Sequence, residues 1–170
     1  DTPAALADMI RPYTYVLEDG AVKLPPVQRV PIDLELPPAL RADYDRLRAQ
    51  SQLSDLEIVA GSAGVLFGKL RQVATGIAYR TRDDARFRLD PFRLEALVNL
   101  VDELQGRPLI VAYELGEELA MLREQWPRAE WIGGGSRDDD ATIARWARRQ
   151  AYPLLFLHPA SAGHGLNGLE

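Results

Sequence analysis

The chain has 170 residues, of which 46% are hydrophobic, and a formal net charge of −5. This composition suits one soluble domain with a sizeable core, and no apolar run approaches the length needed to cross a bilayer. The absence of cysteine excludes disulfide bonds, thiolate metal sites and cysteine nucleophiles. With no signal peptide visible, we expect a cytoplasmic protein without a membrane partner. Asp1 in place of an initiator methionine leads us to expect a piece of a longer protein.

The basic residues are almost all arginine, since Lys23 and Lys69 are the only lysines among 20 basic residues. Six arginines fall between positions 71 and 93 against three acidic residues. Because the planar guanidinium suits phosphate, this segment could bind a nucleic-acid backbone. A solvated loop of mixed charge is the alternative, and the charge pattern alone favours it.

Residues 1–85 predict a helical and extended segment. Its opening is rich in proline, and one alternating stretch predicts a half-buried strand made by Val30, Ile32, Leu34 and Leu36. Pro38 suits the first turn of a helix that runs toward Gln50. A second helix is expected from Val65 to Tyr79, with apolar residues on one face at Leu66, Leu70, Val73 and Ile77.

Residues 86–170 predict an α/β domain, because helical and strand-like stretches alternate from Asp90 onward. The expected helices cover 91–105, 115–126 and 138–150, and the expected strands cover 109–113, 129–132 and 154–157. Short apolar strands separated by longer helices imply right-handed crossovers and a parallel sheet. We therefore predict a three-layer fold with helices on both faces of the sheet.

Gly133–Gly135 follow a predicted strand and precede a helix, which is where glycine-rich loops hold phosphates. The stretch lacks the lysine of a Walker loop and leads into Asp138–Asp140, whose carboxylates would repel a phosphate. A turn followed by helix-capping acids is therefore the favoured interpretation. Three consecutive helical residues point in different directions, so the aspartates do not predict a metal site.

The last apolar run, 154–157, breaks into a loop of small and polar residues. In open parallel sheets, ligands bind beyond the carboxyl ends of the strands. The candidate residues of this loop are Ser161, Gly163, His164, Gly165 and Asn167. A Ser161–His164 hydrolase pair is disfavoured because no G-x-S-x-G elbow surrounds the serine.

The two histidines of the chain differ in what their surroundings predict. For His158, a structural role at the strand end, with its ring hydrogen-bonded to backbone, is favoured over catalysis. His164 lies between two glycines, so it is expected either to touch a ligand or to form a plain turn. The spacing of the histidines does not predict a metal site.

The run His158-Pro-Ala-Ser-Ala-Gly-His-Gly-Leu-Asn167 resembles motif V of the Swi/Snf-type helicases of superfamily two, in the form common among phage and prophage members. Leu70-Arg71-Gln72 resembles the Leu-Arg-Gln on a helix of the second lobe of that family. Pro108–Tyr113 resembles motif IV, the first strand of the second RecA-like lobe, and Leu24-Pro25-Pro26 resembles the segment leading into it. The resemblance covers nearly the whole chain, and motif V is its most specific part.

The resemblance implies a partial C-terminal RecA-like lobe of an ATP-dependent DNA translocase, ending inside or just after motif V. It implies backbone contacts to the nucleotide at Gly163 and Gly165, and a polar residue near the ribose at Asn167. It further implies contacts to double-stranded DNA at Ser161 and His164. Arg71 would be either DNA-proximal or structural.

The departures from the family pattern limit what this chain can do alone. It has no G-x-x-x-x-G-K-[ST] loop, no Asp-Glu box and no arginine-finger motif. We therefore expect no catalytic residue in it and no ATP hydrolysis by it. ATP and Mg²⁺ would be bound mainly by the N-terminal RecA-like lobe of the same parent protein, which would be its partner along with DNA. The alternative is a non-catalytic Rossmann-like module whose 159–167 loop holds a small anionic ligand or a protein.

Overall fold

The computed structural model describes residues 9, 26–136, 138–149 and 151–162, and the chain divides into two compact units, 1–33 and 34–170. In the first unit, residues 26–33 form neither helix nor strand, and Val30 and Ile32 are 80% and 59% exposed. Residues 34–37 also lack a strand. The half-buried strand predicted over Val30–Leu36 is therefore wrong. Pro31 interrupts that stretch and has no N–H for a strand ladder.

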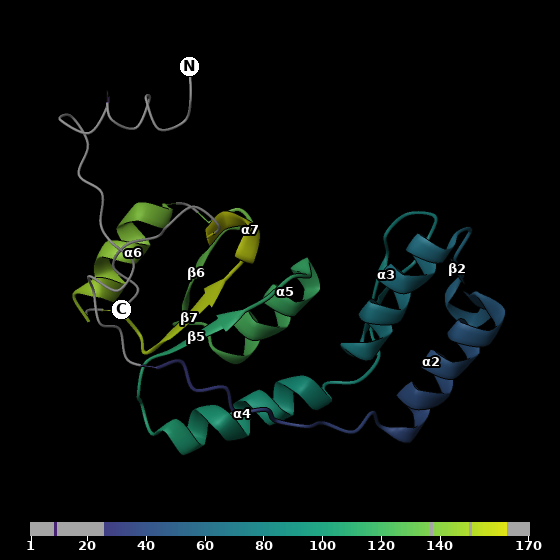
Figure 1. Ribbon diagram of the computed structural model, residues 1–170, viewed down its shortest axis with the longest axis horizontal. Helices are drawn as coiled ribbons and strands as arrows, with labels where there is room; N and C mark the ends of the chain where they lie inside the picture. Colours follow the sequence, from purple (N-terminus) through teal and green to yellow (C-terminus); the bar gives the residue numbers. More distant parts are fainter. Residues whose placement is uncertain (1–8, 10–25, 137, 150, 163–170) are drawn as a thin grey trace. The chain divides into compact units, whose positions relative to one another are not determined.

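The second unit begins with two helices, α2 (Pro38–Gln50) and α3 (Ala63–Ala74), shown in Figure 1. The predicted start at Pro38 is confirmed, and Ser62 caps α3 by accepting a hydrogen bond from the N–H of Val65 at 3.3 Å. Between the helices, β1 (Gln52–Leu53) pairs antiparallel with β2 (Ile58–Val59) around the 3₁₀ turn η2 (Ser54–Leu56). These elements share a core of buried residues, to which residue 78 further along the chain also contributes: Leu40, Leu47, Leu53, Ile58, Val73 and Ala78.

The second predicted helix is wrong in its last part, because residues 77–79 form a strand. Here β3 (Ile77–Tyr79) pairs antiparallel with β4 (Arg86–Arg88). The helix ends before Gly76, which has a φ of +81°. A Cβ at that position would lie 2.1 Å from the carbonyl oxygen of Asp90. The chain can therefore turn into the hairpin only with glycine there.

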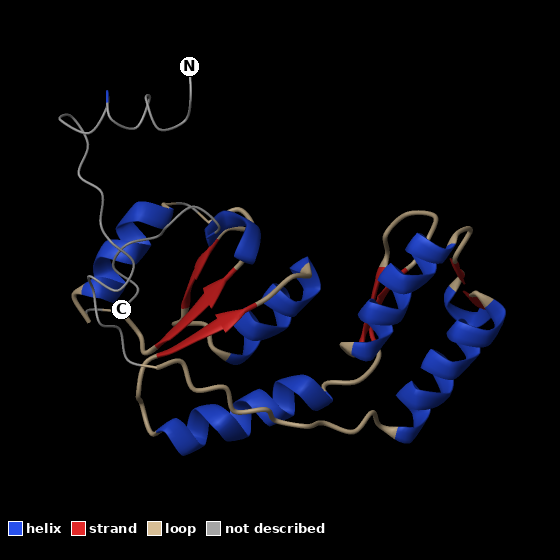
Figure 2. Ribbon diagram, in the orientation of Figure 1, coloured by secondary structure: helices blue, strands red, loops and turns tan. Residues whose placement is uncertain are grey.

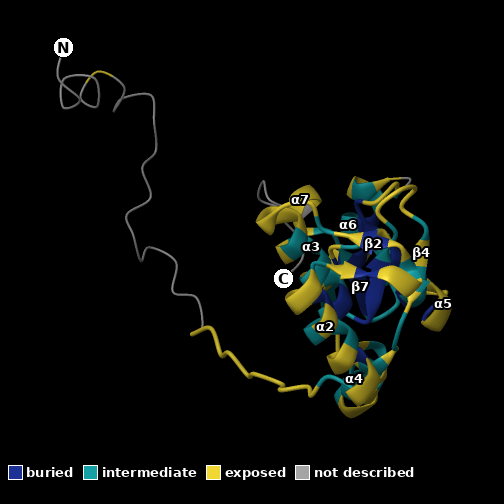
Figure 3. Cartoon of the chain, turned by 90° about the vertical axis from the view of Figure 1, so that its right-hand side faces the viewer, coloured by how far each residue is buried: buried dark blue, intermediate teal, exposed yellow. Residues whose placement is uncertain are grey.

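From Phe92 onward helices and strands alternate as predicted (Figure 2). The elements are α4 (Phe92–Leu104), β5 (Leu109–Ala112), α5 (Gly116–Gln125), β6 (Glu130–Ile132), α6 (Asp139–Ala147), β7 (Leu154–Leu157) and the short α7 (Pro159–Ala162). All three strands are parallel, in the order β5-β7-β6. Leu154, Leu155 and Phe156 of the central strand are buried, as the prediction of a strand covered on both faces requires (Figure 3).

Helices cover both faces of this sheet. Side chains of α4 and α5 pack against Leu154 and Phe156 of β7 on one face, and Trp146 of α6 packs against Leu155 and Ile132 on the other. The chain crosses from β5 to β6 through α5 and returns to β7 through α6. Reversing direction while keeping right-handed crossovers requires the two helices to lie on opposite faces. The α/β class and the parallel sheet flanked by helices are thus confirmed.

The hydrophobic clusters of this unit separate near Phe92, since one draws its members from residues 36–92 and the others from 94–157. The functional boundary predicted near residue 85 stays a prediction. In the portion of the chain that the structure describes, no helix is long and apolar enough to span a membrane.

Candidate site at the carboxyl edge of the parallel sheet

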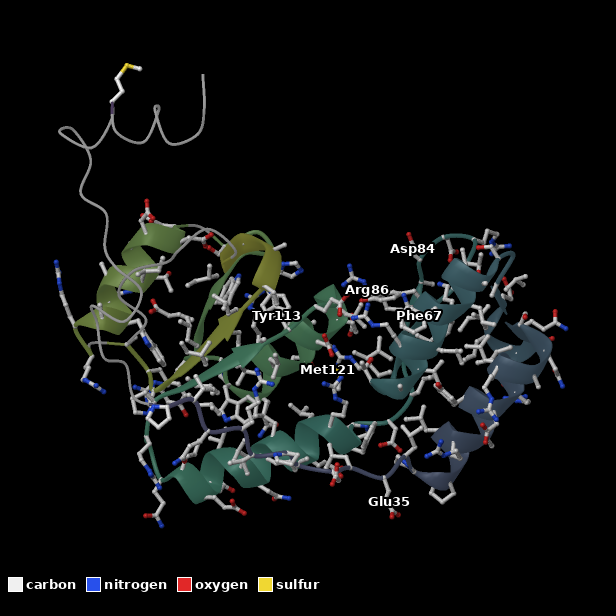
Figure 4. All side chains as sticks on the ribbon, in the orientation of Figure 1. Glu35, Phe67, Asp84, Arg86, Tyr113 and Met121 are labelled. Carbon is white, nitrogen blue, oxygen red and sulfur yellow. The ribbon has the colours of Figure 1, made fainter. Side chains whose placement is uncertain are left out.

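The carboxyl ends of the three parallel strands lie at one edge of the sheet, and a different type of residue follows each strand there. Tyr113, labelled in Figure 4, follows β5. Gly133 follows β6 and His158 follows β7. The N–H of Tyr113 donates to the carbonyl of Leu157 at 3.0 Å, and the N–H of His158 donates to that of Ile132 at 3.1 Å. These bonds extend the ladder one residue beyond the strands. The backbone positions of Tyr113 and His158 are therefore set by the sheet.

The glycine loop, Gly133–Gly135, has positive φ at every residue: 78°, 60° and 81°. A Cβ on Gly133 would lie 2.4 Å from Oγ of Ser161 and 2.9 Å from Cβ of His158. A Cβ on Gly134 would lie 2.6 Å from the hydroxyl oxygen of Tyr113. The loop after β6 is therefore in direct contact with the residues that follow β5 and β7.

The acidic residues after the glycine loop cap α6, as predicted. Oδ1 of Asp138 accepts from the N–H of Ala141 at 2.8 Å. Oδ1 of Asp139 accepts from the N–H of Gly133 at 3.3 Å and from the hydroxyl of Ser136. The N–H of Gly133 is therefore bonded to a carboxylate of the chain itself, which agrees with the favoured interpretation of a turn followed by helix-capping acids.

Tyr113 is the buried aromatic residue at the carboxyl edge of the sheet. Its side chain is buried, its hydroxyl donates to the carbonyl of Ile132 at 3.3 Å, and its ring meets that of His158 edge-on with centroids 5.4 Å apart. Burial, with a smaller contribution from the charge of Asp139, raises the pKa of the Tyr113 phenol. The phenol is therefore neutral at ordinary pH. The contact of His158 with Tyr113 fits a structural role for the histidine.

Among the predicted loop residues, the structure locates Ser161 within α7. Its N–H donates to the carbonyl of His158 at 2.9 Å, and the residue is exposed. Gly163, His164, Gly165 and Asn167 lie outside the described residues. Their predicted nucleotide and DNA contacts remain predictions.

Arg71 approaches the same edge from a different part of the chain. It lies on α3 within the predicted Leu-Arg-Gln helix and forms an ion pair with Glu114, the residue after Tyr113. Both side chains are more than half exposed. Arg71 and Ser161, two predicted DNA contacts separated by 90 positions in the sequence, thus flank the ends of β5 and β7.

The other arginines of the 71–93 segment include three that pair with acidic residues of α5. Nε of Arg88 donates to Glu117 at 2.6 Å, and its two terminal nitrogens donate to Glu124 at 2.6 and 2.7 Å. Arg86, labelled in Figure 4, lies 3.4 Å from Glu117. Arg93 lies 3.2 Å from Glu118. The segment is therefore neither a free phosphate-binding patch nor merely a solvated loop.

We call the contact of Arg88 with Glu117 and Glu124 the arginine clasp. It joins β4 to α5 and hence connects the hairpin with the parallel-sheet part of the unit. Hydrogen bonds to Glu124 and Glu117 raise the pKa of Arg88, and the bond from Arg88 lowers the pKa of Glu124. The predictions from sequence missed this contact. The feature of the sequence that could have indicated this contact is the spacing of glutamates 117 and 124, which lie two turns apart on one helix face.

No group of three or more acidic or histidine side chains capable of holding a metal ion occurs within the described ranges. The residues located at the edge are instead a phenol, an exposed serine hydroxyl, a loop of glycines and an arginine beside a glutamate. A hydroxyl and a guanidinium are suited to donating hydrogen bonds to phosphate oxygens.

No family model matches the chain. It does resemble a phage protein. Protein p41 of Acyrthosiphon pisum secondary endosymbiont phage 1 is 32% identical over 144 residues, which cover 84% of this chain. The match spans only 30% of the length of p41. The similarity links the sequence to phage proteins without specifying an activity.

Proposed function

We propose that this chain contains part of the second RecA-like lobe of a Swi/Snf-type, ATP-dependent DNA translocase encoded by a phage or prophage. The observation that carries the proposal is the position of the motif-V-like run. The strand directly before the run, β7, is the centre of a parallel sheet, and Ser161 of the run follows at the carboxyl edge. Ligands of open parallel sheets bind at this edge.

In the proposed mechanism, Ser161, His164 and Arg71 contact the backbone of double-stranded DNA. The exposed hydroxyl of Ser161 and the half-exposed guanidinium of Arg71 are both open to a phosphate. Glu114 holds the guanidinium until a phosphate replaces it. An exposed ion pair of this kind contributes at most about 1 kcal/mol, so the exchange has a small energetic cost.

The nucleotide contacts of the proposal are Gly163, Gly165 and Asn167. ATP and Mg²⁺ would be bound mainly by the N-terminal lobe of the parent protein. Charge developing on the γ-phosphate is stabilised when two lobes close on it, and closure would move the Ser161 loop along the DNA. The resemblance to p41 supports the phage origin. Its greater length leaves room in a relative for a further lobe.

A salt titration of duplex DNA binding tests the DNA contacts separately. For Arg71→Gln, the slope of log affinity against log salt should become shallower by about 0.9, the value for one phosphate contact. The control Arg48→Gln changes an exposed arginine on α2 that pairs with Asp45 and should leave the slope unchanged. Equal slopes for both variants would contradict the role of Arg71.

Ser161→Ala should weaken DNA binding without changing the salt slope, because the hydroxyl carries no charge. The matched control is Ser54→Ala, an exposed serine at the start of the 3₁₀ turn η2. If the wild type and the variants bind a small anion but do not bind duplex DNA, the result favours the Rossmann-like module instead.

A further inference from the structure

The loops after β6 and β7 are in contact at Gly133, a residue without a side chain. A Cβ on Gly133 would meet two atoms of Ser161, Oγ at 2.4 Å and Cβ at 2.9 Å, as well as Cβ of His158 at 2.9 Å. Non-bonded carbon atoms at optimal separation lie about 3.5–4.0 Å apart. Any residue other than glycine at 133 therefore forces one of the two loops to move.

The loop after β6 is the better anchored of the two. The N–H of Gly133 donates to Asp139 on the capped end of α6. Its neighbour Gly134 is packed so closely that a Cβ there would meet Tyr113 at 2.6 Å and Leu119 at 3.2 Å. Ser161, by contrast, is exposed and lies on a helix of four residues. A methyl group at 133 should therefore displace Ser161.

We propose that Gly133 is a positioning residue for Ser161: because residue 133 has no side chain, the serine can occupy its position at the sheet edge. The inference rests on the proposed function for what Ser161 contacts, a phosphate of duplex DNA. The positioning itself follows from the geometry of the two loops. Gly133 acts through Ser161 and touches no ligand.

Gly135 provides a matched control. Its φ of +81° is close to the +78° of Gly133, so alanine causes similar backbone strain at either position. Among the residues that the structure describes, no atom would lie within 4 Å of a Cβ on Gly135. Any difference between Gly133→Ala and Gly135→Ala therefore reports the contact with the β7 side of the edge.

Urea denaturation of single and double variants tests whether position 133 determines the position of Ser161. The variants form a double-mutant cycle. Ser161→Gly removes both serine atoms that the new methyl group would meet. We compare the effect of Ser161→Gly on the unfolding equilibrium constant in two backgrounds, the wild type and Gly133→Ala. Relative to its effect in the wild type, Ser161→Gly should lower that constant at least about threefold in the Gly133→Ala background. The same cycle with Gly135→Ala should show no coupling. Absence of coupling at Gly133 overturns the proposal.

Should Gly133→Ala alone fail to fold, recovery of folding by added Ser161→Gly supports the proposal. If the double variant also fails to fold while Gly135→Ala folds, the contact with Cβ of His158, and not the contact with Ser161, decides what position 133 accepts, and the proposal is wrong.

The consequence for DNA is measured in the parent protein as ATP hydrolysis against duplex concentration. Gly133→Ala should raise the half-saturating DNA concentration at least about fivefold, which corresponds to losing one modest hydrogen bond. It should leave hydrolysis without DNA and the salt slope unchanged, and Gly135→Ala should behave as wild type. Unchanged half-saturation for Gly133→Ala, where the wild type responds to DNA, overturns the positioning role. If the wild type ignores DNA while the denaturation cycle shows coupling, the proposed function fails and the positioning of Ser161 by Gly133 stands.

Discussion

Replacing Glu117 by glutamine should weaken the arginine clasp and destabilise the chain, although the two hydrogen bonds from Arg88 to Glu124 remain. Glu117 is a buried carboxylate, 7% exposed, in the first turn of α5. It accepts a hydrogen bond from Arg88 at 2.6 Å and lies 3.4 Å from Arg86. Glutamine keeps the shape and removes the charge, so the arginines lose their shared partner while the packing remains.

The expected loss lies between two limits. Breaking a fully buried ion pair costs about 3–5 kcal/mol. Here the side chains of Arg88 and Arg86 are 43% and 59% exposed, so water can replace part of what the carboxylate supplies. A hydrogen bond to a charged group is worth about 1.5–3 kcal/mol. Because the amide oxygen of glutamine can still accept one bond, we expect a loss of about 1.5–2.5 kcal/mol.

Glu114→Gln is the matched control, because Glu114 also pairs with one arginine of the same segment. The side chains of that pair are 54% and 59% exposed, so its loss should be about 0–1 kcal/mol. Equilibrium urea denaturation measures both variants. High salt should weaken any Glu114 contribution and largely spare that of Glu117. Equal losses for the two variants would refute the reasoning that the buried Glu117 contributes more to stability than the exposed Glu114.

Further stability predictions concern a turn, a buried phenol and the core. Gly76→Ala should cost at least about 1 kcal/mol more than Gly106→Ala in urea denaturation. Both glycines have φ above +80°, but only the Cβ at 76 would strike Asp90. The raised pKa of Tyr113 means that stability is present below about pH 10 and falls as pH rises through that pKa, and Tyr113→Phe should remove this alkaline loss. Phe156→Ala at the sheet centre should cost about 3–5 kcal/mol, and a loss under about 1 kcal/mol would contradict its burial.

Those elements of the fold could be predicted whose hydrophobic pattern is contained in a short stretch of sequence. Strand β7 is a run of apolar residues, and such a run between turn residues indicates a strand buried on both faces. The helix predicted through Tyr79 failed because the helical spacing of Ile77 masked the need for glycine at 76. Whether Gly76 ends the helix depends on Asp90, which is distant in sequence and close in space.

The candidate site divides in the same way. Ser161 could be assigned to the sheet edge from sequence, because the carboxyl ends of parallel strands meet there. Its contact with Gly133 could not, since that depends on two loops from different strands reaching one point. The arginine clasp was missed for a related reason. Residues 88 and 117 are 29 positions apart, and no local periodicity links their charges.

The most direct test of the proposed function is ATP hydrolysis by the parent protein and by residues 1–170, each with and without duplex DNA. The account predicts hydrolysis stimulated by DNA in the parent, loss of that stimulation on Ser161→Ala, and no turnover by the 170-residue chain. Robust ATP turnover by the 170 residues alone, or a parent whose hydrolysis ignores DNA, would contradict it.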